Sequence, residues 1–328
     1  MRVRGAISRT NAAADFAREF AADVQYYLTL QPRQLPSRYF YDDLGSALFE
    51  AICRLPWYGI TRAEARMLEA HGREVFERLG DVSSIVELGP GHGEKLRALL
   101  QRGAPHARVL TVHLVDVSAS ALTASARTLS ELDRLDVVPH ETTYEAGLEE
   151  LALQPRRSGR MLAVFLGSNI GNFDTPGAYE FLRAIRGALA HGDGLLLGAD
   201  LVKSERSLRL AYDDPLAVTA AFNRNLLVRI NNELGGDFDV DAFAHRAVWN
   251  ESESRVEMHL IAGRHQRVRI PAAELDITFN QGEGIWTESS YKYEPEAVIA
   301  MLESAGFREV AQWIDPVDRF ALTLVEAV

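Results

Sequence analysis

The stretch Ser84-Ile-Val-Glu-Leu-Gly-Pro-Gly-His-Gly-Glu-Lys95 decides how the fold of this chain is interpreted. Its mostly apolar start predicts a buried strand, and a helical pattern begins at Glu94. Between them, Gly89, Gly91 and Gly93 stand on alternate positions. Glycine adopts unusual backbone dihedrals and lets a ligand press against the main chain. The stretch therefore predicts a ligand-binding turn at the carboxyl end of a parallel strand, where open α/β sheets bind their ligands.

The spacing of the glycines narrows the class of ligand. A dinucleotide fingerprint would need its third glycine at position 94, which is Glu, and the chain has no Gly-Lys-Ser/Thr of a phosphate-binding loop here. An acid two residues before three alternating glycines, as Glu87 is, is typical of S-adenosylmethionine (SAM) methyltransferases. Gly91 is then expected to lie against the methionine part of SAM. The alternative is a tight strand–helix turn without a ligand.

A second acid favours a nucleoside ligand. The residues Val109–Val117 predict the next strand, and Asp116 stands at its end. An acid at the tip of the second strand can accept hydrogen bonds from both ribose hydroxyls. Ser118 follows as the expected N-cap of a helix. The alternative is that Asp116 is itself only a capping or turn residue.

Composition restricts the class of protein. A length of 328 residues suggests about two domains, and 47% hydrophobic with 25% charged residues is normal for a globular protein. The net charge of −11 argues against nucleic acid or an anionic membrane as the main partner. The one cysteine, Cys53, excludes a disulfide framework and a Cys-based zinc site, and its apolar neighbours favour a buried, inert thiol. No signal peptide and no membrane-spanning run is found, so a cytoplasmic location is expected.

Strand and helix patterns alternate from residue 83 to residue 200. Such alternation predicts a parallel sheet with helices on both faces. The pattern resumes near the end of the chain with a helix and two strands that form an antiparallel hairpin. The expected fold is therefore α/β, and a terminal hairpin on a mostly parallel sheet resembles the seven-stranded Rossmann-like sheet of class I SAM methyltransferases. The expected strands are 83–88, 109–117, 135–144, 161–167, 193–200, 308–314 and 320–326, and the expected helices are 94–102, 119–132, 176–190 and 295–304.

The remaining residues predict a second domain. Between 203 and 292 the alternation breaks, with a helical start at 217–232 and later a strand that places Val256, Met258 and Leu260 on one face. The first sixty residues are mostly helical. We therefore expect a SAM-binding domain and an inserted α+β substrate-binding domain that covers the carboxyl edge of the sheet. The two domains comprise residues 62–202 plus 293–328 and residues 1–61 plus 203–292.

Eight groups of residues, none decisive alone, follow one another along almost the full length of the chain. They are Arg38–Phe49, Leu55–Arg62, Ile85–Gly91, Asp116–Ser118, Phe165–Asn172, Tyr212–Asp214 with Ala221–Asn225, Val256–Met258 and Thr287–Lys292. In this joint order they resemble the L-histidine Nα-methyltransferases of ergothioneine biosynthesis. That family transfers three methyl groups from SAM to the α-amine of histidine, through the mono- and dimethyl forms, and produces the betaine hercynine.

The resemblance implies a set of SAM contacts. Gly89, Lys95 and Asp116 match the family's cofactor-binding residues. One departure is visible after the third strand, where the family has an Asp-Phe pair that meets adenine. Here the aligned residues are Thr143 and Tyr144. A threonine hydroxyl can still bond the adenine amine, so we keep both as expected cofactor contacts.

The resemblance also implies a set of substrate contacts. One subset holds the α-amino acid end and orients the amine, a second binds the imidazole ring, and a third forms the pocket walls. These subsets are Asn172 and Tyr212 with Tyr41 and Gly167 nearby; Tyr58, Glu288 and Ser290; and Phe49 and Met258.

The implied residue types suit the chemistry. Methyl transfer to a neutral amine needs nitrogen, carbon and sulfur held in line, and no metal is expected. The amide of Asn172 can orient the amine, Glu288 can accept from one imidazole N–H, and Ser290 lies on the same strand face as Glu288. Local sequence leaves simpler alternatives. Asn172 could be only a turn residue, Tyr212 part of a solvated helix start, and Glu288 a solvated strand residue.

Two rival functions stay open at this stage. One is a homologue that methylates another amino acid, such as tryptophan or tyrosine. Glu288 and Met258 argue against it, because an indole gains little from a carboxylate and needs more room. The other is a non-catalytic SAM-binding module. His92 is interpreted as a loop residue beside the cofactor and not as a base. A monomer is expected.

Overall fold

The computed structural model describes residues 9–103, 109–153 and 159–328, with side chains from Phe16 onward in the first helix. Residues 1–8, which bear on the expected absence of a signal peptide, lie outside this part. The chain divides into two compact units. Unit 1 comprises Ile60–Val202 and Tyr291–Val328, and unit 2 comprises Lys203–Ser290 and the described part of Arg4–Gly59. Each unit is described by itself.

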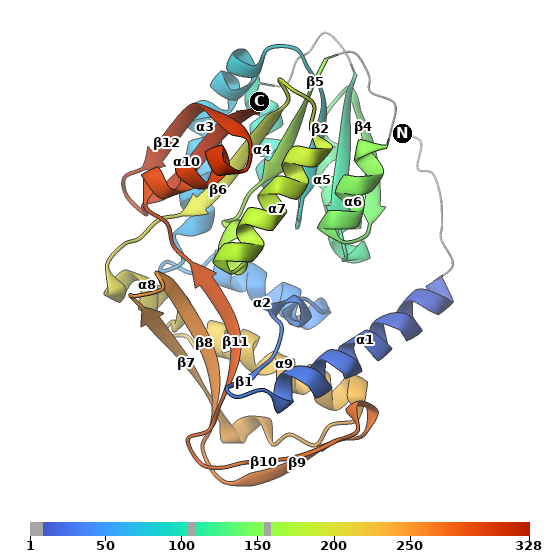
Figure 1. The fold of residues 1–328 in the computed structure, drawn as a ribbon, viewed down its shortest axis with the longest axis vertical. Helices are drawn as coiled ribbons and strands as arrows, with labels where there is room; N and C mark the ends of the chain where they lie inside the picture. Colours follow the sequence, from blue (N-terminus) through green and yellow to red (C-terminus); the bar gives the residue numbers. More distant parts are fainter. Residues whose placement is uncertain (1–8, 104–108, 154–158) are drawn as a thin grey trace. The chain divides into compact units, whose positions relative to one another are not determined.

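Unit 1 is built on a sheet with the strand order β12-β13-β6-β5-β2-β3-β4 (Figure 1). The pairs from β4 to β6 are parallel, whereas β13 runs antiparallel to β6 and β12 antiparallel to β13. The predicted parallel sheet and its terminal hairpin are confirmed. The strands are β2 (Val82–Leu88), β3 (Leu110–Asp116), β4 (Leu135–Glu141), β5 (Arg160–Phe165), β6 (Gly194–Asp200), β12 (Phe307–Asp315) and β13 (Phe320–Ala327).

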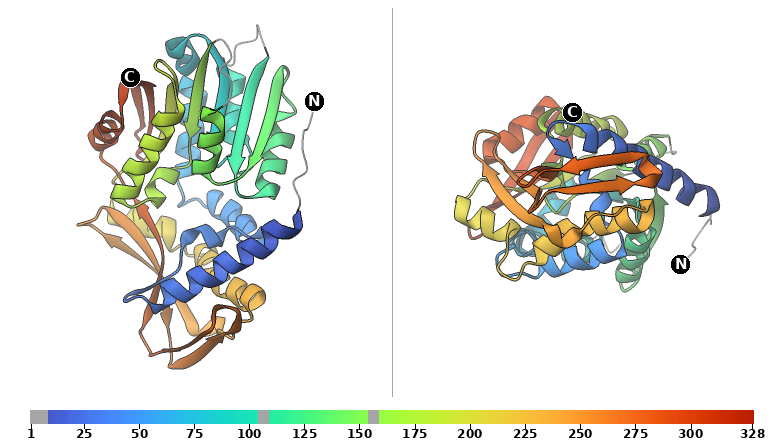
Figure 2. Two further views of the ribbon diagram at one scale, coloured as in Figure 1. Left: turned by 45° about the vertical axis from the view of Figure 1, so that its right-hand side comes forward. Right: turned by 90° about the horizontal axis from the view of Figure 1, so that it is seen from below.

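Helices cover both faces of this sheet, as Figures 1 and 2 show. Each face buries an apolar cluster that the helices share with the strands. Because both faces of the sheet are buried, its strands are nearly continuous runs of apolar residues in the sequence. One face is covered by α6 (Tyr144–Ala152), α7 (Thr175–Ala188) and α10 (Pro295–Ser304), and the other by α3 (Ile60–Leu79), α4 (Glu94–Gly103) and α5 (Ala119–Leu129).

Some predicted boundaries were wrong. The strand expected to reach residue 144 ends at Glu141, because the Thr143 side chain caps α6 by accepting a hydrogen bond from the Ala146 amide. The helix expected to reach residue 132 ends at Leu129. The helices α3 and α6 were not predicted.

Unit 2 combines a mixed sheet with helices. Its four-stranded sheet has the order β1-β11-β8-β7, and β9 pairs with β10 separately. The predicted alternation is confirmed, since Val256, Met258 and Leu260 are all buried. The strands are β1 (Arg33–Gln34), β7 (Phe243–Asn250), β8 (Arg255–Ala262), β9 (Gln266–Ile270), β10 (Leu275–Phe279) and β11 (Gly284–Tyr291). The helices are α1 (Arg9–Thr29), α2 (Asp43–Cys53), α8 (Glu205–Tyr212) and α9 (Val218–Leu234), with a 3₁₀ turn η1 (Ser37–Phe40).

Two further features of the described chain bear on the predictions. Cys53 ends α2 and is only half-buried, so the expectation of a buried thiol was wrong. Among the described helices, none has the length and apolar character needed to cross a membrane.

Unit 1 holds the two ends of the 203–290 segment side by side. The Val202 amide donates to the Tyr293 carbonyl at 3.0 Å, and the Tyr293 amide donates to the Asp200 carbonyl at 3.1 Å. Beside these bonds, the Lys292 ammonium lies 3.2 Å from the Asp200 carboxylate, and both side chains are almost fully buried. The chain therefore leaves the sheet of unit 1 and returns to it at one place, where backbone hydrogen bonds and an ion pair join the outgoing and returning segments.

Candidate active site

The glycine turn after β2 is open at the expected position. Gly89, Gly91 and Gly93 all have positive φ, at 72°, 54° and 77°. A Cβ at Gly89 would lie 2.5 Å from the Tyr144 hydroxyl, and one at Gly93 would lie 2.6 Å from Ser125 Oγ. At Gly91, in contrast, a Cβ would meet no atom within 4 Å. The main chain of the turn is thus packed on two sides and faces open space at the position predicted to meet SAM.

Glu87, the acid of the glycine motif, is buried at the end of β2. It is 2% exposed, and its Oε2 has no hydrogen-bond partner among the described residues. Burial raises the pKa of Glu87 to about 8; the Lys95 ammonium opposes the shift, and the Glu64 and Asp116 carboxylates add to it. A buried polar atom without a partner is costly in a native protein unless a ligand satisfies it.

Asp116 stands at the end of β3, as predicted. Its Oδ1 accepts the Ser118 amide at 2.8 Å, and the Ser118 hydroxyl in turn caps α5. Partial burial raises the pKa of Asp116, and the backbone hydrogen bonds from Ser118 and Val117 oppose that shift. Asp116 therefore does act as a turn residue, but a carboxylate can accept several hydrogen bonds and can serve a ligand as well.

The residues aligned with the family's adenine pair have different surroundings. Thr143 is exposed and serves as the N-cap of α6. The Tyr144 ring packs against Phe165 and Phe181, and its hydroxyl lies against Gly89. Burial raises the pKa of Tyr144 well above its usual range, so the hydroxyl stays protonated. A role of either residue at adenine remains a prediction.

Lys95 and Gly167 are brought together by a residue that was not predicted. The Lys95 ammonium lies 2.7 Å from Oε2 of Glu64 on α3, and the Gly167 amide donates to Glu64 Oε1 at 2.7 Å. A Cβ at Gly167 would lie 2.7 Å from Lys95 Nζ. Only a glycine, here with φ +78°, leaves room for this approach.

Asn172 ends a 3₁₀ turn, η2 (Asn169–Asn172), that follows β5, and it is exposed. The loop before it is tightly held. The Ser168 hydroxyl accepts the Asp200 amide at 2.9 Å, and the Ile170 carbonyl accepts the Tyr293 hydroxyl at 3.2 Å. Asn172 is therefore a turn residue by its backbone, and it is exposed at the end of a loop that is held by hydrogen bonds.

Five predicted substrate residues form one contiguous cluster in unit 2. Edge-to-face ring contacts join Tyr41 to Phe49 at 5.6 Å, Phe49 to Tyr58 at 6.3 Å, and Tyr58 to Tyr212 at 6.3 Å between centroids. The Tyr212 hydroxyl and Ser290 Oγ then form a hydrogen bond of 2.8 Å. The cluster links the residues expected at the amino acid end to those expected at the imidazole.

A buried histidine fixes the backbone of Tyr212. Tyr212 ends α8 and is 8% exposed, so the alternative of a solvated helix start was wrong. Its carbonyl lies 2.7 Å from His245 Nε2, while Nδ1 of the same ring lies 2.9 Å from the Asn223 amide nitrogen. Since an amide NH₂ only donates, Nδ1 must accept and Nε2 must carry the proton. Burial also lowers the pKa of His245, which keeps the ring neutral.

Glu288 and Met258 lie on neighbouring strands of unit 2. Glu288 is half-buried on β11, two residues before Ser290, so the pleat places the two on one face. Full solvation of Glu288 is therefore not observed. Met258 is 1% exposed on β8, and its carbonyl accepts the Thr287 hydroxyl at 3.0 Å.

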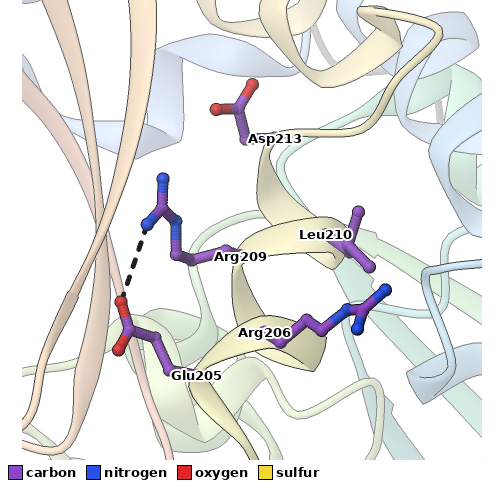
Figure 3. A pocket seen from close by; sticks show the side chains of 5 residues that line it. All are labelled: Glu205, Arg206, Arg209, Leu210 and Asp213. Carbon is purple, nitrogen blue, oxygen red and sulfur yellow. Dashed lines mark ion pairs between the residues drawn. The ribbon is translucent and has the colours of Figure 1, made fainter.

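Unit 2 also carries a pocket that was not predicted, shown in Figure 3. It is lined by residues of α8 and the residue after it, including an ion pair of 3.7 Å between Glu205 and Arg209. The pocket contains none of the predicted substrate residues, although it shares a helix with Tyr212. Its lining residues are Glu205, Arg206, Arg209, Leu210 and Asp213.

The residues that sequence reasoning missed are those that hold others in place. They are Glu64, Asn223, His245 and Phe222, whose ring contacts both Tyr41 and Phe49. Asn223 and Phe222 fall within the group Ala221–Asn225, so a signal for them existed. No pattern around Glu64 or His245 sets them apart from surface residues of a helix and a strand.

The sheet, the glycine turn and the acid at the end of β3 define a class I SAM-dependent methyltransferase. The model of a family described as histidine-specific, SAM-dependent methyltransferases matches residues 20–327. The chain belongs to this family.

Two relatives of the chain are named histidine N-alpha-methyltransferases, and a more distant one is named for tryptophan. It is 45% identical to the histidine N-alpha-methyltransferase of Mycobacterium tuberculosis over 92% of this chain and 93% of that protein. It is 43% identical to the enzyme of the same name from Mycolicibacterium smegmatis, over 95% and 96% of the two chains. A more distant relative is the L-tryptophan methyltransferase of Psilocybe serbica, 26% identical over 90% of this chain and 88% of that protein.

Proposed function

We propose that this enzyme transfers three methyl groups from SAM to the α-amine of L-histidine and produces hercynine for ergothioneine biosynthesis. Membership of the histidine-specific family supports the substrate. The observation that carries the proposal at the level of residues is the contiguous cluster from Tyr41 to Ser290. It joins hydroxyl groups suited to an amino acid backbone to a strand face suited to an imidazole.

We assign SAM to unit 1. Three features fit a cationic nucleoside: the open main chain at Gly91, the Glu87 oxygen that has no partner within the described part of the chain, and the carboxylate of Asp116. Gly89 and Lys95 complete the proposed contacts, and Thr143 with Tyr144 are the proposed adenine neighbours. When bound, SAM supplies an electrophilic methyl group on a sulfonium.

The assignment of Asp116 predicts a loss of SAM affinity on truncation. Asp116→Ala should weaken SAM binding by about 1–3 kcal/mol, because charge-assisted hydrogen bonds to the ribose are lost. Isothermal titration calorimetry measures this directly. Asp133→Ala, which removes an exposed carboxylate of the same unit, is the control and should bind SAM normally. An unchanged affinity in Asp116→Ala would remove the ribose assignment.

We assign the amino acid end of histidine to Asn172 with Gly167, and to Tyr212 with Tyr41. The amide oxygen of Asn172 can accept from the amine, and its NH₂ can donate to the substrate carboxylate. The nitrogen gains positive charge as each methyl group is added, and aromatic faces stabilise such a cation. The trimethylated nitrogen has no lone pair left, so the reaction stops after three transfers.

We assign the imidazole to Glu288, Ser290 and Tyr58, with Met258 and Phe49 as walls. Glu288 accepts from one ring N–H, and a hydroxyl meets the other nitrogen. A site with buried polar groups discriminates strongly against a substrate that leaves them unpaired. An indole has an N–H but no second ring nitrogen, so it would leave the hydroxyl without the partner that an imidazole offers.

The specificity assignment predicts a shift in substrate preference. Glu288→Ala should lower kcat/KM for histidine by about 2–4 kcal/mol in transition-state terms, because a ring N–H loses a charged partner. SAM affinity should stay nearly unchanged, and the relative rate with tryptophan should rise, further so with Met258→Val added. The measurement is the ratio of histidine to tryptophan turnover, with Glu251→Ala in an exposed turn as the matched control. If both rates fall in parallel, Glu288 does not set specificity.

The reaction itself is tested by mass spectrometry of products formed from SAM and all twenty amino acids together. Histidine should gain up to three methyl groups, and fragmentation should place all of them on the α-nitrogen. Methylated tryptophan or tyrosine as the main product would favour the rival substrate. SAM binding without any product would favour a non-catalytic module.

We further propose that the enzyme works as a monomer in the cytoplasm, since every proposed contact to SAM and histidine comes from a single chain. Sedimentation should give a mass near 36.4 kDa at micromolar concentration. A mass of twice that value would contradict the monomer.

A further inference from the structure

Glu64 is a fully buried carboxylate that none of the proposed contacts uses. It lies in the second turn of α3 and is 0% exposed. One oxygen receives the Gly167 amide and the other faces the Lys95 ammonium, both at 2.7 Å. A Cβ at Gly198 on β6 would come within 2.3 Å of Glu64 Oε1. The surrounding glycines therefore leave a space that the carboxylate fills.

Stability alone does not account for a carboxylate at this position. Removing a charge from water is expensive, and even a well-paired buried ion pair often contributes less stability than apolar residues of the same size. Neighbouring positions of α3 are filled by apolar side chains instead, since Met67 and Leu68 pack into the core. The role of Glu64 is therefore better inferred from the groups that it contacts, the Lys95 ammonium and the Gly167 amide, than from the energy of its ion pair.

The two partners of Glu64 belong to different parts of the proposed site. Lys95 follows the glycine turn at the start of α4 and is a proposed SAM contact. Gly167 begins the loop that ends at Asn172, a proposed contact of the substrate amine. We propose that Glu64 is a positioning residue that fixes the cofactor-binding lysine and the amine-binding loop against each other. This inference rests on the roles proposed above for Lys95 and Asn172.

Glu64→Gln separates the two connections. Glutamine keeps the length and a carbonyl oxygen that can accept the Gly167 amide, but its NH₂ group cannot pair with the Lys95 ammonium. The Kd for SAM should therefore rise about tenfold, as expected for the loss of one charge-assisted contact. The KM for histidine should change by less than about twofold, because the Gly167 connection is kept. Glu77→Gln, an exposed position on the same helix, is the control and should leave both constants unchanged.

A double-mutant cycle with Lys95→Met shows whether Glu64 acts through Lys95. If it does, Glu64→Gln/Lys95→Met should bind SAM no more weakly than Lys95→Met alone. Additive losses would overturn the proposal, because Glu64 would then act by another route. Should Glu64→Gln fail to fold, the comparison of Lys95→Met with the double variant still decides, since the double variant removes the buried charge pair as a unit.

The cycle also separates this inference from the proposed site. If Lys95→Met weakens SAM binding but Glu64→Gln does not, the positioning role is wrong and the Lys95 assignment stands. If Lys95→Met itself leaves SAM affinity unchanged, the Lys95 assignment fails and the positioning role fails with it. Tenfold weaker SAM binding in Glu64→Gln with an unchanged histidine KM supports both the positioning role of Glu64 and the assignment of Lys95 as a SAM contact.

Discussion

Glu87 is a buried carboxyl group whose proton sets the charge beside the glycine turn. Its pKa of about 8 in the folded chain lies above the ordinary value of 4.5, mainly because burial disfavours the charged form. Between about pH 4.5 and pH 8 the folded state therefore keeps a proton that the unfolded chain has already released. The stability that this proton confers is complete below pH 4.5 and is lost as the pH rises toward 8.

Glu87→Gln should remove this pH dependence. The side chain of glutamine has no proton to release, so the variant should gain unfolding free energy relative to the wild type as the pH rises. The gain should approach about 1.4 kcal/mol per pH unit between pH 5.5 and 7.5. Urea unfolding without SAM at three pH values measures the difference. Glu141→Gln, at an exposed position, should give a curve parallel to the wild type; the same result for Glu87→Gln would show that Glu87 is ionised when folded.

Single residues differ in how far their surroundings could be predicted from sequence. The positive φ of Gly91 and the position of Asp116 follow from a local pattern of strand, turn and helix. Glu64 lies 103 residues from Gly167, and His245 lies 33 residues from Tyr212. Contacts of this kind depend on which elements pack together, and no local pattern encodes them.

Among the elements, the helices that were missed carried usable signals. In α3 the buried residues recur at helical spacing, with Ala63, Met67 and Leu68 on one face. Their periodicity was obscured by the many charged residues between them. At the start of α6, the β-branched Thr142 and Thr143 and the aromatic Tyr144 extended the predicted strand, whereas Thr143 is in fact the N-cap and Tyr144 the first residue of the helix.

The start of α9 depends on a single carboxylate. Ala217 stands at its N-cap without a side chain that could cap it, and Asp214 accepts the amides of Leu216, Val218 and Thr219 instead. Burial alone would raise the pKa of Asp214, but these hydrogen bonds outweigh it and lower the pKa below its usual value. The helix N-terminus is thus satisfied by a residue three positions before the usual cap.

Asp214→Ala should therefore destabilise the chain by about 1–3 kcal/mol, since three amides at the helix start, among them the buried amide of Thr219, lose their acceptor. Urea unfolding at pH 7 measures the loss. Asp214→Asn keeps one acceptor oxygen and should show a smaller loss, while Asp213→Ala, an exposed neighbour, should show little. Equal losses in the alanine variants at 213 and 214 would contradict a capping role.

At the scale of the whole molecule, the two units differ in how predictable they were. The sheet of unit 1 follows from alternating strands and helices, because its parallel pairs need helical crossovers. In unit 2 the strand β1, at Arg33–Gln34, pairs with β11 at Ile285 and Trp286. A two-residue strand whose partner lies some 250 residues away has no local signature, so only the α+β character of this unit could be anticipated.

Backbone hydrogen bonds join Val202 to Tyr293 beside the ion pair of Asp200 and Lys292, and this junction has an evolutionary consequence. Because residues 203–290 lie between these two bonded segments, changes of sequence or length within them can leave the backbone hydrogen bonds of the unit 1 sheet in place. Under the roles proposed above, a lineage can thus alter the imidazole contacts Glu288 and Ser290 within this segment while the proposed SAM contacts of unit 1 stay the same.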